Sequence, residues 1–134
     1  MKPEFLLDTH IAVRWLAQPQ RLSKDQLRLI RAEIARARPL GLAAITLLEM
    51  ATLLTDRGRG LKVAPGDLLL QLEASPNFVV LPITFEIAAE LASVGRHLRD
   101  PADRAIVATA RVHRLKLITS DERIINSKLV PRLA

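Results

Sequence analysis

The sequence predicts an α/β domain whose parallel sheet of four to five short strands carries helices on both faces. Short apolar runs alternate along the chain with segments in which apolar residues recur at helical spacing, a pattern typical of parallel sheets. The runs expected as strands lie at residues 5–7, 42–45, 78–81 and 115–118, with a small fifth candidate at 129–130. The 134 residues contain no repeat and no linker, so we expect a single domain over residues 1–134.

The segments between these runs contain signals that predict where the helices begin. Asp8 opens the first helix directly after the first strand, and Ser23-Lys24-Asp25-Gln26 has the capping-box pattern that starts the second. Pro101 stands in the first turn of a later helix, where its missing N–H costs nothing. The helices are expected at about 8–16, 23–37, 46–56, 65–74, 84–94 and 100–114, with a short helical turn after residue 121. Pro39 and Gly41 are expected to end the second helix.

The composition predicts a cytoplasmic protein with a polyanionic partner. The chain has no cysteine, which excludes disulfides, thiolate catalysis and cysteine–zinc sites. No apolar run reaches the roughly 18 residues that a membrane span needs. The 20 Lys and Arg against 14 Asp and Glu give a net charge of +6; nucleic acid is the commonest polyanion that such a balance attracts, and a merely arginine-rich surface is the alternative. Aromatic residues make up only 3% of the chain, so we expect contacts to phosphates before stacking on bases.

Acidic residues stand where the strands of the predicted sheet end. Asp8 follows the first strand, Glu49 lies four residues past the second, and Asp121 lies three past the strand at 115–118. Asp103 falls in the first turn of the helix before that last strand. Each acid taken alone has an alternative interpretation as a helix cap, because Asp is common at helix N-termini. For Glu49 this alternative is a capping box formed with Thr46.

Together these carboxylates predict a site for a divalent cation. In a parallel sheet, ligands bind beyond the carboxyl ends of the strands. Carboxylates gathered there repel one another, and a helix N-terminus offsets only about 0.3–1 kcal/mol per charge. Oxygen ligands without cysteine favour Mg²⁺ or Mn²⁺ over zinc, and such sites leave positions open to water and substrate phosphates. An acidic site in a basic protein is therefore the pattern expected of a metal-dependent phosphodiesterase.

Several motifs, taken in order, resemble those of the PIN-domain family. They are Leu6-Leu7-Asp8-Thr9-His10, Glu49 in the first helical turn after the second strand, Arg99-Asp100-Pro101-Ala102-Asp103-Arg104 followed by Ile106-Val107-Ala108-Thr109-Ala110, and Leu117-Ile118-Thr119-Ser120-Asp121. The chain is more narrowly similar to the VapC branch, the ribonuclease toxins of bacterial and archaeal toxin–antitoxin pairs. The resemblance covers essentially the whole chain and implies a PIN-like three-layer α/β/α fold.

The resemblance implies an endoribonuclease that depends on Mg²⁺ or Mn²⁺. Its catalytic and metal-binding quartet is expected to be Asp8, Glu49, Asp103 and Asp121, supported by Thr9, Asp100 and Ser120. Asp8 is expected as the central ligand, with Asp103 and Asp121 completing the cage directly or through water. Glu49 is expected to bind a second metal ion or to orient the attacking water. Two departures from the branch, Ala102 in place of a bulky aromatic residue and the absence of a Trp before Glu49, bear on substrate preference more than on the acids.

The resemblance also implies partners, namely an RNA substrate, a cognate antitoxin protein and a second copy of the chain in a homodimer. Arg57, Arg59 and Lys62 are predicted to contact RNA or an acidic antitoxin segment, with a solvated loop as the alternative. Apolar residues of the first two helices are candidates for an antitoxin groove, with core packing as the alternative for each: Ile11, Trp15, Leu27 and Ile30.

Two other function classes fit parts of the sequence. A catalytically inactive PIN-like module would hold nucleic acid without cutting it, but the four acids would weaken its binding to phosphates. A phosphoacceptor signalling domain has a similar size and sheet, but it requires an acid pair at the first strand end, and Asp8 has no acidic neighbour. The expected chemistry assigns no role to the histidines His10, His97 and His113.

Overall fold

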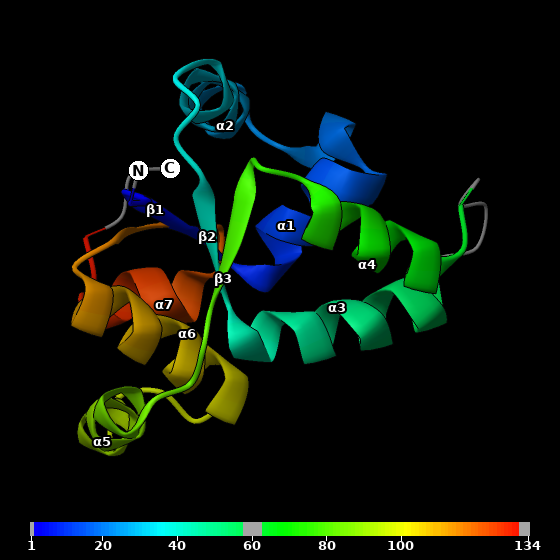
Figure 1. The fold of residues 1–134 in the computed structure, drawn as a ribbon. Helices are drawn as coiled ribbons and strands as arrows, with labels where there is room; N and C mark the ends of the chain where they lie inside the picture. Colours follow the sequence, from blue (N-terminus) through cyan, green and yellow to red (C-terminus); the bar gives the residue numbers. More distant parts are fainter. Residues whose placement is uncertain (1, 58–62, 132–134) are drawn as a thin grey trace.

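The chain folds into a parallel sheet with helices on both faces. The computed structural model describes residues 2–57 and 63–131 (Figure 1). The strands are β1 (Phe5–Leu7), β2 (Leu40–Ala43), β3 (Phe78–Leu81) and β4 (Lys116–Ile118), in the order β3-β2-β1-β4. The helices are α1 (Thr9–Ala17), α2 (Lys24–Ala35), α3 (Ala44–Arg57), α4 (Pro65–Ala74), α5 (Phe85–Val94), α6 (Pro101–His113) and α7 (Glu122–Ser127), with a 3₁₀ turn at Pro19–Arg21. Within the described ranges, no helix is long and apolar enough to cross a membrane.

Side chains alternate along β1, and this alternation divides the core into two layers. Phe5 and Leu7 point to one face, where they pack with residues of α1, α2, α3 and α4. Leu6 points to the other face and packs with residues of α5, α6 and α7. Figure 1 shows the sheet between α1, α3 and α4 on one side and α5, α6 and α7 on the other. The predicted three-layer α/β/α fold around a parallel sheet is confirmed.

The second strand and the helix after it begin earlier than the sequence predicts. The strand covers Leu40–Ala43, not residues 42–45, and α3 starts at Ala44, not at Thr46. Gly41, expected to end the preceding helix, lies inside the strand, where a Cβ would stand 3.2 Å from the carbonyl oxygen of Phe5. The glycine therefore allows β2 to approach β1 closely. Because glycine also commonly ends helices, the sequence alone did not indicate this use.

The predicted fifth strand at residues 129–130 is wrong. These residues have no strand pairing, although the N–H of Leu117 donates to the carbonyl oxygen of Pro131 at 3.0 Å. Pro131 has no N–H to return to β4, so the chain passes the edge strand without extending the sheet.

The basic segment predicted to contact RNA or an antitoxin is only partly described. Arg57 is the last residue of α3. Arg59 and Lys62 lie outside the described residues, so the role of this segment stays a prediction.

Parallel pairing brings the ends of three strands together. Leu7 pairs with Ile118, and the N–H of Asp8 continues this ladder by donating to the carbonyl oxygen of Ile118 at 3.0 Å. On the other side of β1, Leu7 pairs with Leu42 of β2, which leads directly into α3. The segments that leave β1, β2 and β4 therefore start side by side at one edge of the sheet, and each contains a predicted site residue.

Candidate active site

Asp8 follows the inner strand β1 and is held in one orientation. The residue is only 3% exposed. Its Oδ1 accepts a hydrogen bond from the N–H of Thr9 at 2.7 Å, and its Oδ2 accepts one from the hydroxyl of Thr119 at 2.7 Å. Burial raises the pKa of Asp8, and the hydrogen bond from Thr119 offsets only part of that rise. A carboxylate fixed at both oxygens has its remaining lone pairs aimed in set directions, as a metal ligand requires.

Thr119 connects Asp8 to Asp121. Its hydroxyl donates to Asp8 and accepts the N–H of Asp121 at 3.0 Å. Asp121 caps α7, with its Oδ1 accepting the N–H of Arg123 at 2.9 Å. Burial pushes the pKa of Asp121 upward, but the hydrogen bonds and charge of Arg123 outweigh burial and lower the pKa. Asp121 is therefore ionised at neutral pH.

Glu49 joins the site through the hydroxyl of Thr9. That hydroxyl donates to Oε1 of Glu49 at 2.6 Å and lies 3.0 Å from the hydroxyl of Thr46. Because a hydroxyl has one proton, Thr46 must be the donor of the second bond. The capping-box alternative for Thr46 and Glu49 is wrong, because α3 has already begun at Ala44 and both side chains turn to Thr9.

Two further acids reach the site from the start of α6. Asp100 caps this helix, and its Oδ1 accepts the N–H of Ala102 at 2.8 Å. Asp103, one turn later, is buried and has its pKa raised to about 7, first by burial and then by the negative charge of Asp100. The carboxylates of Asp121 and Asp8 raise the pKa of Asp103 further. Thr119 contacts both Asp8 and Asp121, Arg123 contacts both Asp121 and Asp103, and Asp100 starts the same helical turn as Asp103, so these four aspartates lie at one site.

Arg123 lies across the two acids at the outer side of the site. Its Nη2 stands 3.3 Å from Oδ2 of Asp121 and 3.6 Å from Oδ2 of Asp103. Among the described residues, no other cationic side chain forms an ion pair with either acid. A side chain that looks like an ordinary surface arginine in the sequence therefore touches two members of the predicted quartet.

The donor set fits a hydrated Mg²⁺ or Mn²⁺ ion. All the candidate ligands at the site are carboxylate oxygens, which these hard cations prefer. Within residues 2–57 and 63–131, no three acidic or histidine side chains converge closely enough to hold one ion between them. Mg²⁺ commonly takes one or two carboxylates and fills its other positions with water and substrate phosphates. The spacing of the acids therefore fits ligation shared with water, not a closed cage of direct carboxylate ligands.

A small cavity of about 120 Å³ opens beside Asp8 and Asp121. His10, Arg14 and Ser120 complete its wall. His10 and Arg14 lie one turn apart on α1 and so face the same way. His10, to which the sequence analysis assigns no role, therefore borders the acidic site.

Ser120 is held by a residue from the second helix. The Nε2 of Gln26 donates to the hydroxyl of Ser120 at 2.9 Å. The same side chain accepts the N–H of Ser23 at 3.0 Å, which completes the predicted capping box of α2. Gln26 thus ties the start of α2 to the loop between Thr119 and Asp121.

Several residues of the site are not predicted from the sequence. Thr119 and Arg123 contact the acids, Gln26 and Thr46 bond residues beside them, and Arg14 lines the small cavity. A signal was present for the two threonines, because each is a hydroxyl residue within three positions of a predicted acid. For Gln26, which lies 94 positions from its partner Ser120, only the three-dimensional fold reveals the contact.

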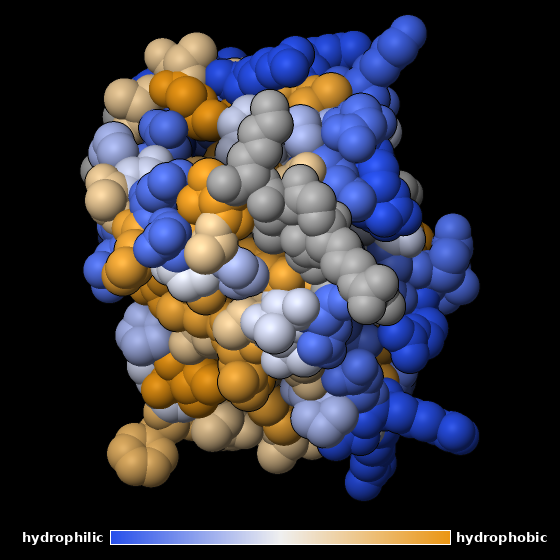
Figure 2. All heavy atoms as spheres, turned by 90° about the vertical axis from the view of Figure 1, so that its right-hand side faces the viewer, coloured by the Kyte–Doolittle hydropathy of each residue, from blue (hydrophilic) through white to orange (hydrophobic). Residues whose placement is uncertain are grey.

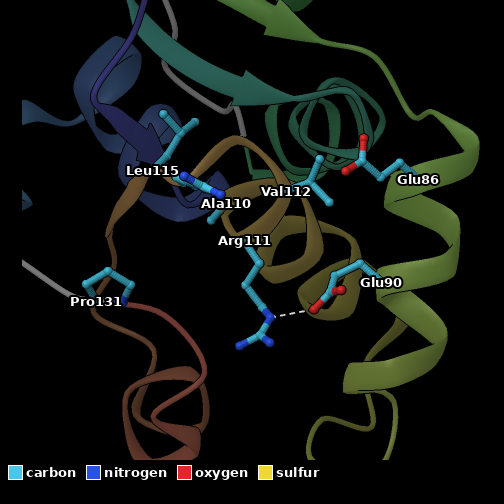
Figure 3. A pocket seen from close by; sticks show the side chains of 8 residues that line it. Glu86, Glu90, Ala110, Arg111, Val112, Leu115 and Pro131 are labelled. Carbon is cyan, nitrogen blue, oxygen red and sulfur yellow. Dashed lines mark hydrogen bonds and ion pairs between the residues drawn. The ribbon is translucent and has the colours of Figure 1, made fainter.

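Two of the larger hollows lined by described residues differ in character, and both lie away from the acids. One of about 550 Å³ lies between α5 and the last turn of α6, where Arg111 contacts Glu90 at 2.6 Å (Figure 3). The acids of α6 stand at the opposite end of that helix. The other hollow, about 500 Å³, is lined mainly by apolar side chains such as Leu69 and Val80, and Figure 2 shows apolar side chains gathered on the face that carries α3 and α4. Neither hollow includes a residue of the acidic site.

The residues considered for an antitoxin groove belong to the core. Ile11 and Ile30 have no exposed surface. Trp15 and Leu27 are half-buried and pack against the same cluster. The core-packing interpretation is therefore confirmed for Ile11 and Ile30, whereas a groove that includes Trp15 and Leu27, which keep exposed surface, stays a prediction.

Comparison with known proteins shows the family to which the chain belongs. The sequence matches the PIN domain family over residues 5–128. It is 36% identical over 120 residues to Ribonuclease VapC22 of Mycobacterium tuberculosis, a match that covers 89% of this chain and 88% of that protein.

Two solved structures have the same fold. VapBC2 from Rickettsia felis, bound to a DNA fragment from their promoter, aligns with a TM-score of 0.74 at 12% identity and covers 99% of this chain and 98% of the other. FitAcB from Neisseria gonorrhoeae aligns with a TM-score of 0.69 at 25% identity over 97% and 96% of the two chains. With the family match over nearly the whole chain, these similarities establish that the protein belongs to the PIN-domain family, in which it is similar to the VapC ribonucleases.

Proposed function

We propose that this protein is a metal-dependent endoribonuclease that acts as the toxin of a toxin–antitoxin pair. The observation that carries the proposal is the meeting of aspartates from β1, α6 and α7 at one edge of the sheet, with Glu49 linked to them through Thr9. Similarity to Ribonuclease VapC22 supports the same activity. The proposed catalytic and metal-binding residues are Asp8, Glu49, Asp103 and Asp121, supported by Thr9, Asp100 and Ser120.

The acids have different roles in this proposal because their surroundings differ. Asp8, fixed at both oxygens and buried, is the principal ligand of Mg²⁺ or Mn²⁺. Asp103 and Asp121 share the ligation, partly through water. When bound, the ion would lower the pKa of water and neutralise charge that develops on the phosphate. Glu49, oriented by Thr9, positions the attacking water, and in-line attack on the phosphodiester leaves a 5′-phosphate and a 3′-hydroxyl.

The proposed partners follow from charge and from the fold comparison. The net charge of +6 draws RNA toward the protein at long range, although the site itself is acidic. Arg57, Arg59 and Lys62 are proposed to contact RNA phosphates or the antitoxin. The shared fold with VapBC2 supports a cognate antitoxin protein as the second partner, and a homodimer is proposed as the assembly.

Cleavage of RNA by the purified protein tests this function. We expect hydrolysis in the presence of Mg²⁺ or Mn²⁺, loss of hydrolysis in EDTA, and recovery when the cation is added back. Asp8→Asn should lower the cleavage rate by about a thousandfold or more, because the principal ligand is lost while the shape of the side chain is kept. Asp67→Asn, at an exposed acid in the first turn of α4, is the matched control and should cut RNA at the wild-type rate.

A binding module without activity is the alternative, and the same experiment separates it. Such a module would bind RNA with or without EDTA and release no product. Wild-type rates for Asp8→Asn would instead show that cleavage arises elsewhere in the protein or from a contaminant.

A further inference from the structure

Arg123 occupies the outer side of the acidic site in a way that an ordinary surface ion pair does not. Its Nη2 lies between two carboxylates from different elements, 3.3 Å from Asp121 and 3.6 Å from Asp103. These acids are separated by a whole strand in the sequence and meet only through the fold. The guanidinium is thus a positive charge positioned between two members of the proposed metal-binding quartet.

The site needs such a charge when no cation is bound. Asp8, Asp100, Asp103 and Asp121 are close enough to repel one another, and hydrogen bonds from neutral hydroxyls orient carboxylates without cancelling their charge. A guanidinium cancels part of that charge, as a divalent cation would. We propose that Arg123 is a resident counter-ion, which pairs with Asp103 and Asp121 in the metal-free protein and must be displaced when the catalytic cation binds. This inference rests on the proposed metal dependence.

The geometry of Arg123 suits displacement. Its side chain is 71% exposed, so it can turn into solvent without breaking core packing. Both contacts are longer than the 2.6 Å pair of Arg111 with Glu90 elsewhere in the protein. A loosely held, exposed arginine can leave, whereas Thr119, buried between Asp8 and Asp121, cannot.

A counter-ion and a residue that supports the metal ligands predict opposite changes in cation affinity when Arg123 is removed. If Arg123 competes with the cation, removing it strengthens cation binding; if it holds the acids in place for the cation, removing it weakens binding. An exposed ion pair of this kind changes an equilibrium by about two- to fivefold. We therefore expect Mn²⁺ to bind Arg123→Ala about two- to fivefold more tightly than the wild type.

Calorimetric titration of the purified, metal-free proteins with Mn²⁺ at pH 8 tests this prediction. This pH lies above the pKa of Asp103, which is about 7, so the carboxyl group of Asp103 is mostly ionised. Arg123→Lys keeps the charge and should stay close to the wild type. Arg28→Ala is the matched control, because Arg28 is 77% exposed and pairs at 3.4 Å with Asp25, which is not among the site acids; its Mn²⁺ affinity should be unchanged.

Thermal unfolding supplies a readout that does not depend on activity. In EDTA at low salt, Arg123→Ala should unfold at a lower temperature than the wild type, because the acids have lost their counter-ion. At saturating Mn²⁺ the difference should disappear, since Arg123 then pairs with neither acid in the wild type and is absent from the variant. An equal loss of stability with and without Mn²⁺ would make Arg123 a structural residue only.

Two other outcomes would overturn the counter-ion proposal, and they differ in what they mean for the proposed function. Unchanged or weaker Mn²⁺ binding by Arg123→Ala, beside normal binding by the wild type, overturns the counter-ion proposal and leaves the proposed function standing. Failure of the wild type itself to bind Mn²⁺ removes the metal dependence and the counter-ion proposal together.

Discussion

The two halves of the acidic site are held by different chemistry. In the hydroxyl-held half, Thr9 and Thr119 fix Asp8 and Glu49 with neutral donors at 2.6–2.7 Å. In the arginine-held half, Asp103 and Asp121 share one guanidinium at 3.3–3.6 Å. In the first half, neutral neighbours hold the carboxylates by hydrogen bonds. In the second half, a buried and a half-buried acid are neutralised by an exposed charge that can leave.

This difference separates orientation from charge compensation. A hydrogen bond to a charged group stabilises by about 1.5–3 kcal/mol and fixes direction, but it leaves the net charge in place. An exposed ion pair contributes less and fixes direction poorly, but it cancels charge. The hydroxyl-held half is therefore built to present ligands, and the arginine-held half is built to respond to what binds.

Loss of the Thr119 hydroxyl should have the largest effect on RNA cleavage among the substitutions that distinguish the two halves. Thr119→Val keeps the shape of the side chain but removes the donor to Asp8 and the acceptor for the N–H of Asp121. Groups that orient metal ligands typically contribute 10- to 100-fold to affinity or rate, so we expect RNA cleavage to fall by roughly that factor. Steady-state cleavage rates at saturating Mn²⁺ measure the effect.

Thr109→Val is the control for this substitution. Thr109 is as buried as Thr119, but its hydroxyl donates to the carbonyl oxygen of Ala105 within α6. Its replacement should leave the cleavage rate within about twofold of the wild type, since an ordinary hydrogen bond contributes only about 1 kcal/mol and this one touches no acid. Equal losses in both variants would mean that Thr119 acts through stability alone.

The pH dependence of the free energy of unfolding tests whether the negative charge of the acids is left partly uncompensated in the metal-free protein. The pKa of Asp103 is about 7 in the folded protein, against about 3.9 in an unfolded chain. Between these values the folded state binds a proton that the unfolded state has released. The metal-free protein should therefore lose stability as pH rises from about 4 to about 7 and then level off. The raised pKa of Asp8 acts in the same direction.

Urea unfolding in EDTA at pH 5 and pH 8 measures this loss. We expect the free energy of unfolding to be lower at pH 8 by about 1–2 kcal/mol, after allowance for solvent screening. Asp103→Asn should flatten the dependence, because the titrating group is gone. The lowered pKa of Asp121 has the opposite sign, but it acts below about pH 4. A protein that becomes more stable from pH 5 to pH 8 would contradict the crowding of acids described here.

The sequence predicts the fold and the acids because both depend on local patterns. Apolar runs and capping signals place most strands and helices, and an acid after a strand end in a parallel sheet falls at the binding edge by topology alone. Errors in the predicted bounds of an element occur where a residue type has two common uses. Gly41 is a residue type that commonly ends helices, yet it lies in β2, where a Cβ would stand 3.2 Å from the carbonyl oxygen of Phe5 in β1, closer than an ordinary contact.

The partners of the acids could not be predicted in the same way. A threonine or arginine near an acid in the sequence is common, and nothing local says that Thr119 bonds Asp8 across 111 positions or that Arg123 reaches back to Asp103. Such contacts depend on strand order and on side-chain rotamers, which the hydrophobic pattern does not specify. Residue types that perform chemistry are visible in a single sequence, whereas residues that tune them become visible only in the fold.

The smallest predicted effect concerns Asp100, for which two interpretations are open: a helix cap only, or a ligand of the metal ion. Its Oδ1 accepts the N–H of Ala102 at the start of α6, which is the work of a cap, yet its charge raises the pKa of Asp103. Asn is as good an N-cap as Asp, whereas Ala is worse by about 0.5–2 kcal/mol. If Asp100 only caps, Asp100→Asn should keep both the cleavage rate and the melting temperature, and Asp100→Ala should lower the melting temperature alone. A tenfold or greater loss of cleavage in Asp100→Asn would instead make Asp100 a fifth acid of the catalytic site, and would extend the arginine-held half to the cap of α6.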